Sequence, residues 1–226
     1  MRRLLFTSFA LLISNTVASA HFVFLVPDSD SVVKAIFSDS LSPDKNVSID
    51  KIDNSKVWSV DETGKATELK WTIDKDGGFY KIEVPGTGTR MVAVNTDYGI
   101  LQRGDSKPFW LNYYSKTLVG GAPSGGKASL GGKVPVEIVP LVEGGKIRFV
   151  ARVNGKPAPK LEVSVTVPGA EKAETLTTDE KGTTQSFDKP GRYAVRFRHV
   201  ETKSGEEKGK KYDEVRSYAT LIVDLK

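Results

Sequence analysis

His21 and His199 are the residues of this chain with the clearest capacity for chemistry. They are the only two histidines among 226 residues, and cysteine is absent. Imidazole nitrogens are therefore the strongest transition-metal ligands that the side chains offer. His21 directly follows Ala18-Ser19-Ala20, a run of small residues typical of a signal peptidase site. Cleavage after Ala20 would make His21 the first residue of the exported protein.

A histidine at the N-terminus can bind a metal through two nitrogens of one residue. The α-amine and the imidazole Nδ1 close a chelate ring, and their ordinary pKa values, about 8 and about 6.5, let a metal displace both protons near neutral pH. One further imidazole would complete the three-nitrogen arrangement called a histidine brace. All-nitrogen, tetragonal coordination suits Cu(II) best and Ni(II) next. We therefore expect a divalent transition metal at His21.

His199 is the candidate for the second imidazole. It ends an alternating segment, residues 191–200 (GRYAVRFRHV), on the face of the apolar side chains, and a polar loop follows. Alternation of this kind predicts a half-buried strand with His199 at the rim of a core. Two interpretations stay open. His199 either shares the metal with His21 or is a rim histidine that hydrogen-bonds a backbone carbonyl.

Carboxylates at the ends of expected strands could add oxygen ligands. Asp97 follows the apolar run MVAVN, and Asp213 begins the last strand, across a hairpin from His199. We predict these two as further metal ligands because of their positions. Asp39, at the end of an earlier strand, is a third candidate. Each also fits the simpler interpretation of a solvated turn residue.

The segments that must position these residues are expected to be almost entirely β-strands. Short alternating or fully apolar runs, separated by Gly, Pro, Asn and Asp, recur from residue 21 to the C-terminus. Only residues 109–119 (FWLNYYSKTLV) are expected to form a short helix or irregular turn. Residues 119–133 are rich in glycine and predict a loop or linker. The predicted fold class is all-β.

The glycine-rich segment divides the predicted strands into two groups. We predict a β-sandwich domain over residues 21–118 and a second, immunoglobulin-like sandwich over residues 134–226. The order of the turns NGKP, TTDEKG and KPGRY in the second group resembles carboxypeptidase-regulatory-like sandwiches. One larger β-structure divided by a loop is the alternative.

The first twenty residues predict an exported protein. Arg2 and Arg3 precede an apolar run from Leu4 to Ile13, which is shorter than the ~20 residues that cross a bilayer. We interpret residues 1–20 as a cleaved signal peptide and expect a periplasmic or extracellular protein without membrane insertion after cleavage. The formal charge is +5, but the positive residues are scattered, so nucleic acid is not an expected partner.

Several segments together resemble a known family. They are AHFVFLVPD (20–28), VNTDYGILQRGDSKPFWLNYYSKTLV (94–119), TTDEKGTTQSFDKPGRYAVRFRH (177–199) and YDEVRSYATLIVDL (212–225). The chain resembles the secreted domain-of-unknown-function family described as a periplasmic component of nickel/cobalt transport. The resemblance implies a role in transition-metal handling, with Ni(II)/Co(II) beside Cu(II) as the metal and a membrane metal transporter as partner. It places His21 and His199 at the family's histidine positions, whereas Ser217 stands near where relatives are expected to have another histidine.

The predicted function is therefore an exported metal-binding protein, not an enzyme, that serves metal uptake, delivery or buffering. One alternative is a brace-copper oxidative enzyme, which would need an aromatic-rich flat face around the copper. The three tryptophans, Trp58, Trp71 and Trp110, are widely spread along the sequence and give that alternative little support. The other alternative is an adhesion or surface module that binds no metal. Neither a Ser-His-Asp order nor a phosphate-binding loop is present in the sequence.

Overall fold

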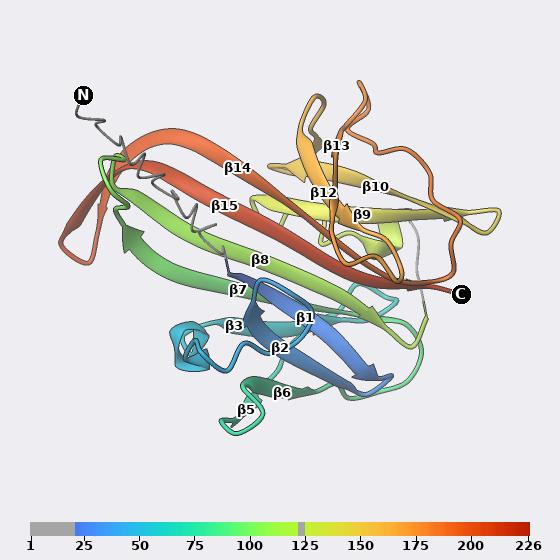
Figure 1. Ribbon diagram of the computed structural model, residues 1–226. Coiled ribbons are helices and arrows are strands. Elements are labelled where there is room, and N and C mark those ends of the chain that lie inside the picture. The colour runs from blue at the N-terminus through green and yellow to red at the C-terminus, as the bar shows by residue number, and fades with distance from the viewer. Residues whose placement is uncertain (1–20, 122–124) are drawn as a thin grey trace, which may run out of the picture.

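The computed structural model describes residues 21–121 and 125–226 (Figure 1). The predicted signal peptide, residues 1–20, lies outside the described residues. Within the described ranges the chain forms fifteen β-strands and two short 3-10 helices, which confirms the all-β prediction. None of the helices in these ranges is long and apolar enough to cross a membrane.

The elements follow one another from β1 to β15. Those of the first half are β1 (Phe22–Ser29), β2 (Val32–Ser38), η1 (Ile49–Ile52), β3 (Lys56–Val60), β4 (Ala66–Glu68), β5 (Trp71–Asp74), β6 (Phe79–Glu83), β7 (Arg90–Leu101) and β8 (Phe109–Val119). Those of the second half are η2 (Gly125–Ala128), β9 (Val136–Glu143), β10 (Lys146–Val153), β11 (Lys156–Pro157), β12 (Glu162–Thr166), β13 (Glu174–Thr177), β14 (Gly191–Glu207) and β15 (Lys210–Leu225).

Three sheets form three layers, as Figure 1 shows. The central sheet has the strand order β13-β12-β14-β15-β8-β7-β3-β4, and β1-β2-β6-β5 and β11-β10-β9 form the two outer sheets. Alternation along β7 shows that the outer sheets lie on opposite faces: Val92 and Val94 belong to one hydrophobic core, Met91 and Ala93 to the other. We call the face under β1 the first face and the face under β9 the second face.

The two predicted sandwich domains, residues 21–118 and 134–226, share the central sheet. The first core draws mainly on the first group of strands and the second core mainly on the second group. However, β15 pairs in parallel with β8, for example Ser217 with Asn112, and this pair joins the two groups into one eight-stranded sheet. The chain therefore has two cores on opposite faces of one sheet. The immunoglobulin-like character of the second unit remains a prediction.

Residues 109–119 form strand β8, so the expectation of a short helix or irregular turn is wrong. β8 pairs with β7 on one side and β15 on the other. Its side chains enter both cores, Leu111 and Tyr113 the first and Leu118 the second. β8 is buried on both faces, and Asn112, Ser115, Lys116 and Thr117 are buried together with its apolar residues. The alternation of apolar and polar residues that marks a half-buried strand is therefore lost.

The glycine-rich segment, predicted as a loop or linker over residues 119–133, is anchored in its second half. Lys116 of β8 and Glu137 of β9 form a buried ion pair with 2.5 Å between Nζ and Oε1. Lys116 also donates to the carbonyl of Ala128, and Glu137 accepts from the N–H of Leu130. Burial lowers the pKa of Lys116, and Glu137 opposes that shift. The described part of the segment is thus an anchored loop, while residues 122–124 lie outside the description.

Strand β1 is the edge of its sheet, and three hydroxyl groups of the central sheet fix it in place. Tyr113 donates to the carbonyl of His21 at 3.1 Å. Ser115 and Thr220 both donate to the carbonyl of Val23, each at 2.7 Å. These bonds satisfy edge carbonyls that would otherwise be buried without partners. They also place His21 on the first face of the central sheet.

Candidate functional site

His21 lies directly before β1, partly covered by aromatic side chains. Its side chain is 17% exposed, and its ring lies 5.4 Å from that of Phe37, centroid to centroid. The rings of Tyr98 and Tyr113 pack in turn against Phe37. Phe37 comes from β2, Tyr98 from β7 and Tyr113 from β8, so strands of both sheets around the first core build this wall. The imidazole is therefore packed against an aromatic surface and stays partly exposed.

Asp44 is the polar partner of His21. Its Oδ2 lies 2.7 Å from Nε2 of the imidazole. The same carboxylate accepts the backbone N–H of Asn46 at 2.9 Å. The hydrogen bond with His21, followed by that with Asn46, lowers the pKa of Asp44 below its ordinary value. Asp44 is therefore an ionised acceptor near neutral pH.

This contact determines which imidazole nitrogen can bind a metal. An ionised carboxylate only accepts hydrogen bonds, so Nε2 of His21 is the donor and carries the proton. In the neutral ring the lone pair then lies on Nδ1, the nitrogen that chelates together with an N-terminal α-amine. Nδ1 has no hydrogen-bond partner among the described residues. A carboxylate on the far nitrogen is also the usual outer partner of a metal-binding histidine.

Asp39 directly follows strand β2, at the end where β1 begins. Phe22 of β1 is opposite Ser38 of β2 in an antiparallel register. His21 directly precedes Phe22 and Asp39 directly follows Ser38, so both residues lie at the same end of the β1–β2 pair. Asp39 also acts electrostatically on Arg196 of β14, where its charge favours the protonated guanidinium. The candidate position Asp39 thus lies at the end of the strand pair where His21 lies.

The structure does not bring His199 to His21. His199 is opposite Ser217 in the β14–β15 pair, and the neighbouring Tyr218 points to the first face, where its ring packs on Phe22 at 5.3 Å. Adjacent residues of a strand point to opposite faces, so His199 and Ser217 point to the second face. The hypothesis of a shared site is therefore corrected: the central sheet separates the two imidazoles. His199 shares its face with the second core, as the alternation predicted.

Asp97 and Asp213 are not brought to His21 either. The carboxylate of Asp97 accepts from Trp110 Nε1 at 2.6 Å and lies 3.6 Å from Lys208 Nζ. Asp213 donates its backbone N–H to the carbonyl of Pro108. Among the described residues, no group of three or more His, Cys, Asp or Glu side chains could hold a metal ion. A metal at His21 would therefore depend on the α-amine as its second nitrogen ligand.

The sequence did not indicate Asp44 as a partner of His21, because Asp44 lies in the polar segment SLSPDKN rather than at the end of an expected strand. The pairing of the two consecutive apolar strands β1 and β2 could have indicated which segment lies near His21. An antiparallel pair returns the chain after β2 to the start of β1, so residues shortly after residue 38 had to lie near His21. The identity of the contacting carboxylate depended on the conformation of that loop.

Comparisons with known proteins identify a family. No curated protein sequence matches the chain. Among solved structures, the chain is similar to the BSP domain of a biofilm-associated protein, at 11% identity and a TM-score of 0.19, with 90% of this chain and 29% of that chain covered. It is similar to a tetra-tandem repeat of a large adhesion protein, at 13% identity and a TM-score of 0.22, with 91% and 50% covered.

A third similar structure is a DUF3823 family protein from Bacteroides ovatus, at 12% identity and a TM-score of 0.20, with 76% of this chain and 89% of that chain covered. Similarities this low carry no argument about function. The family model for the domain of unknown function DUF4198 matches residues 18–201, which is most of the chain and includes both His21 and Asp44. The chain therefore belongs to the DUF4198 family.

Proposed function

We propose that this protein is an exported transition-metal-binding protein whose site is the N-terminal residue His21. The observation that carries the proposal is the hydrogen bond between His21 Nε2 and Asp44 Oδ2. It leaves Nδ1 as the nitrogen with the lone pair, next to the α-nitrogen that signal cleavage would convert to a free amine. Cu(II) is the expected tightest ligand, followed by Ni(II) and then Co(II).

The protein would supply two nitrogens of the metal's coordination shell, both from His21. Water or a donor from a partner would fill the remaining positions, because His199, Asp97 and Asp213 do not contact His21. The aromatic wall around Phe37 would restrict the metal to the open edge of the ring. A shell with positions left for outside donors suits a protein that takes up a metal and releases it.

We propose reversible binding, not catalysis, as the role of this site. Asp44 holds the imidazole in the orientation and tautomer that a metal needs, and the hydroxyl of Tyr113 fixes the backbone of the same residue. These contacts preorganise the ligand without supplying a proton donor or nucleophile. Uptake, delivery to a membrane metal transporter, and buffering are the roles that such a site would serve.

The proposal is tested by titrating Cu(II) and Ni(II) into protein that begins at His21. Calorimetry should show one metal per chain. Electron paramagnetic resonance of the Cu(II) form should show nitrogen coupling. Two comparisons isolate the chelate: the His21→Ala variant removes the imidazole, and a long N-terminal extension removes the nearby amine. Unchanged affinity in both comparison proteins would contradict the proposal.

A further inference from the structure

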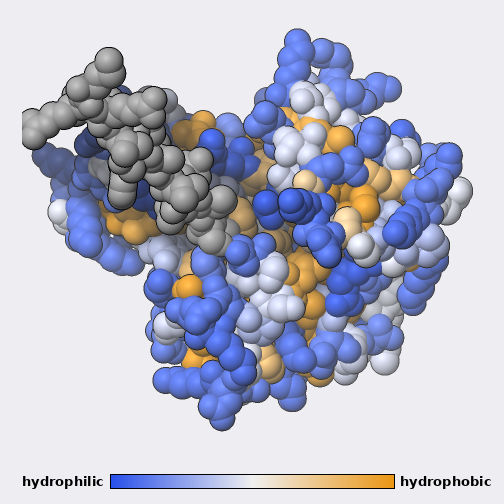
Figure 2. Space-filling model, in the orientation of Figure 1, coloured by the Kyte–Doolittle hydropathy of each residue, from blue (hydrophilic) through white to orange (hydrophobic). Residues whose placement is uncertain are grey.

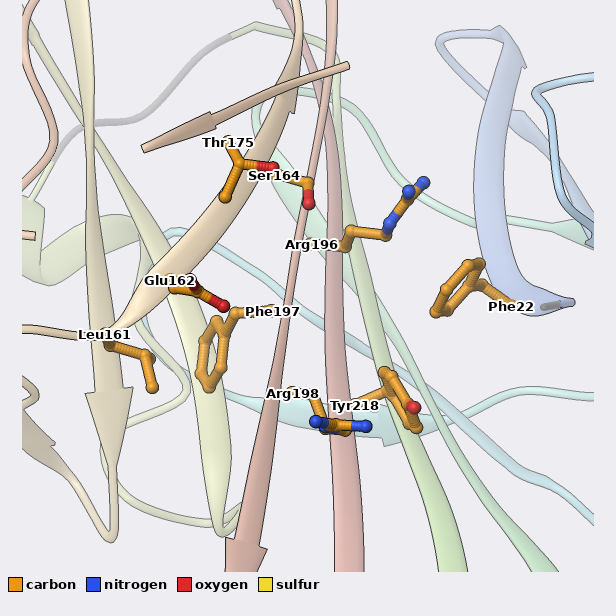
Figure 3. Close-up of a pocket in the computed structure, with 9 residues that line it drawn as sticks. All are labelled: Phe22, Leu161, Glu162, Ser164, Thr175, Arg196, Phe197, Arg198 and Tyr218. Atoms are coloured by element: carbon orange, nitrogen blue, oxygen red, sulfur yellow. The ribbon is translucent and has the colours of Figure 1, made fainter. Parts of the chain in front are cut away.

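A groove lies beside β1 on the first face of the central sheet (Figure 3). Its volume is about 440 Å³, within the range of about 300 to 1,000 Å³ that is typical of small-molecule sites. The residues that matter for its chemistry are Phe22, Ser164, Thr175, Arg196, Arg198 and Tyr218. We call this cavity the β1 groove.

The β1 groove exists because the outer sheet covers only part of the first face. β1 packs on β8 and β15 and leaves the same face of β14, β12 and β13 open beside it. Ser164 is opposite Arg196 in the β12–β14 pair and opposite Thr175 in the β12–β13 pair. Residues opposite each other share a face, so these three side chains form a polar floor. Most of the surface in Figure 2 is hydrophilic, with hydrophobic residues in small patches.

Arg196 is the central group of the groove. Its guanidinium lies 4.5 Å from the centre of the Phe22 ring, which holds the planar group in a fixed orientation. Burial lowers the pKa of Arg196, yet an arginine side chain stays charged in proteins. The charge of Asp39 acts on Arg196 and favours the protonated guanidinium. Arg192, on the same face of β14, makes a two-pronged ion pair with Asp224.

The surroundings of Arg196 define the ligand class. Arg198 adds a second guanidinium, and Ser164, Thr175 and Tyr218 add hydroxyl groups. Glu162 also lines the groove, so the site is not uniformly positive. A planar guanidinium recognises a carboxylate through two parallel hydrogen bonds. The aromatic rings of Phe22 and Tyr218 offer apolar contacts that an inorganic anion could not use.

We propose that the β1 groove binds a small organic carboxylate that has an apolar portion. The carboxylate would lie on Arg196 and the hydroxyls of the floor, and the apolar portion would lie against the aromatic wall of Phe22 and Tyr218. This inference goes beyond the proposed metal site and does not depend on it, because it requires neither a free α-amine nor a metal.

The test uses metal-free protein and two probe acids, phenylacetate and 4-methylpentanoate. Calorimetry should show saturable binding of at least one acid. Acetate lacks the apolar portion and phenylacetamide lacks the charge, so both should bind more weakly. Arg196→Met keeps an apolar stem over the Phe22 ring but removes the charge. It should weaken binding about tenfold or more, the loss expected for one charge-assisted hydrogen bond.

Arg148→Met is the matched control. Arg148 is an exposed arginine on β10, paired with Glu143 at 3.3 Å, and its loss should leave binding unchanged. If Arg196→Met does not fold, nuclear magnetic resonance of the unsubstituted protein decides: the amide signals of Ser164, Thr175 and Arg196 should move on titration. Absence of saturable binding by both acids overturns the proposal. Binding that is equally tight in Arg196→Met, or that leaves the three amide signals unmoved, overturns it as well.

Discussion

His21 Nε2 lies 2.7 Å from Asp44 Oδ2, and this contact joins the residue before β1 to the loop after β2. The ring is further packed against Phe37, and its backbone carbonyl accepts the hydroxyl of Tyr113. Three independent contacts thus fix one residue before any metal is bound. A preorganised ligand loses less conformational entropy on binding, so the contacts made to His21 should matter almost as much as the residue itself.

Asp44→Ala should weaken Cu(II) binding about 10- to 100-fold, the usual cost of removing an outer partner of a metal ligand. The substitution frees the imidazole to rotate and to adopt the other tautomer. Calorimetric titration of protein beginning at His21 measures the effect. Asp76→Ala, which removes an exposed carboxylate, is the control. Equal losses in the two variants would show that general charge, not the contact with His21, is responsible.

Metal affinity should fall as the pH decreases from about 8 to about 5, because protons compete for the amine and the imidazole. The pKa of Asp44 lies below its ordinary value of 3.8, so Asp44 stays ionised throughout this interval and cannot cause the loss. Titrations at four pH values check the slope. A flat profile would exclude His21 nitrogens as the ligands.

The same lowered pKa predicts how Asp44 contributes to stability. A carboxyl group whose pKa is lower in the folded chain stabilises the fold above its unfolded pKa, and this contribution is lost as the pH falls through the folded value. The difference in unfolding free energy between the parent and Asp44→Ala should therefore not shrink as the pH falls from 7 to 5, and should shrink only below about pH 4. Urea unfolding at several acidic pH values measures it, and a difference that shrinks already between pH 7 and 5 would contradict this assignment.

His199→Ala should leave Cu(II) affinity within about twofold of the parent, since the central sheet separates the two histidines and twofold corresponds to well under 1 kcal/mol. His21→Ala should abolish the site. The comparison distinguishes the N-terminal site from the shared site that the sequence suggested. A large loss on replacing His199 alone would restore the shared-site hypothesis.

Lys116→Met should destabilise the fold by about 3 to 5 kcal/mol, because it leaves Glu137 buried without its charged partner. The double variant Lys116→Met/Glu137→Leu should recover part of that loss, since it removes the unpaired charge. Urea unfolding measures both, with the exposed Lys133→Met as control. If Lys116→Met were as stable as Lys133→Met, the ion pair between Lys116 and Glu137 would not stabilise the contact between β8 and β9.

The sequence alone determined the fold class and indicated His21 as the candidate metal ligand. Alternating and apolar runs separated by turn residues predicted an all-β chain, because side-chain periodicity and turn chemistry are local properties. The same locality placed His199 on a core-facing side of its strand, which the structure confirms. The proposed N-terminal position of His21 also follows from sequence alone, through the small residues that precede it.

Tertiary structure decided which residues meet. Periodicity places a side chain on one face of its own strand but does not say which sheet covers that face, so the separation of His199 from His21 became visible only through the parallel pairing of β15 with β8. The meeting of Asp44 with His21, and of Arg196 with Phe22, depends on a loop conformation and on the docking of one sheet edge on another sheet. Both contacts join residues that are far apart in the sequence. They form only when two cores are buried on opposite faces of a single sheet.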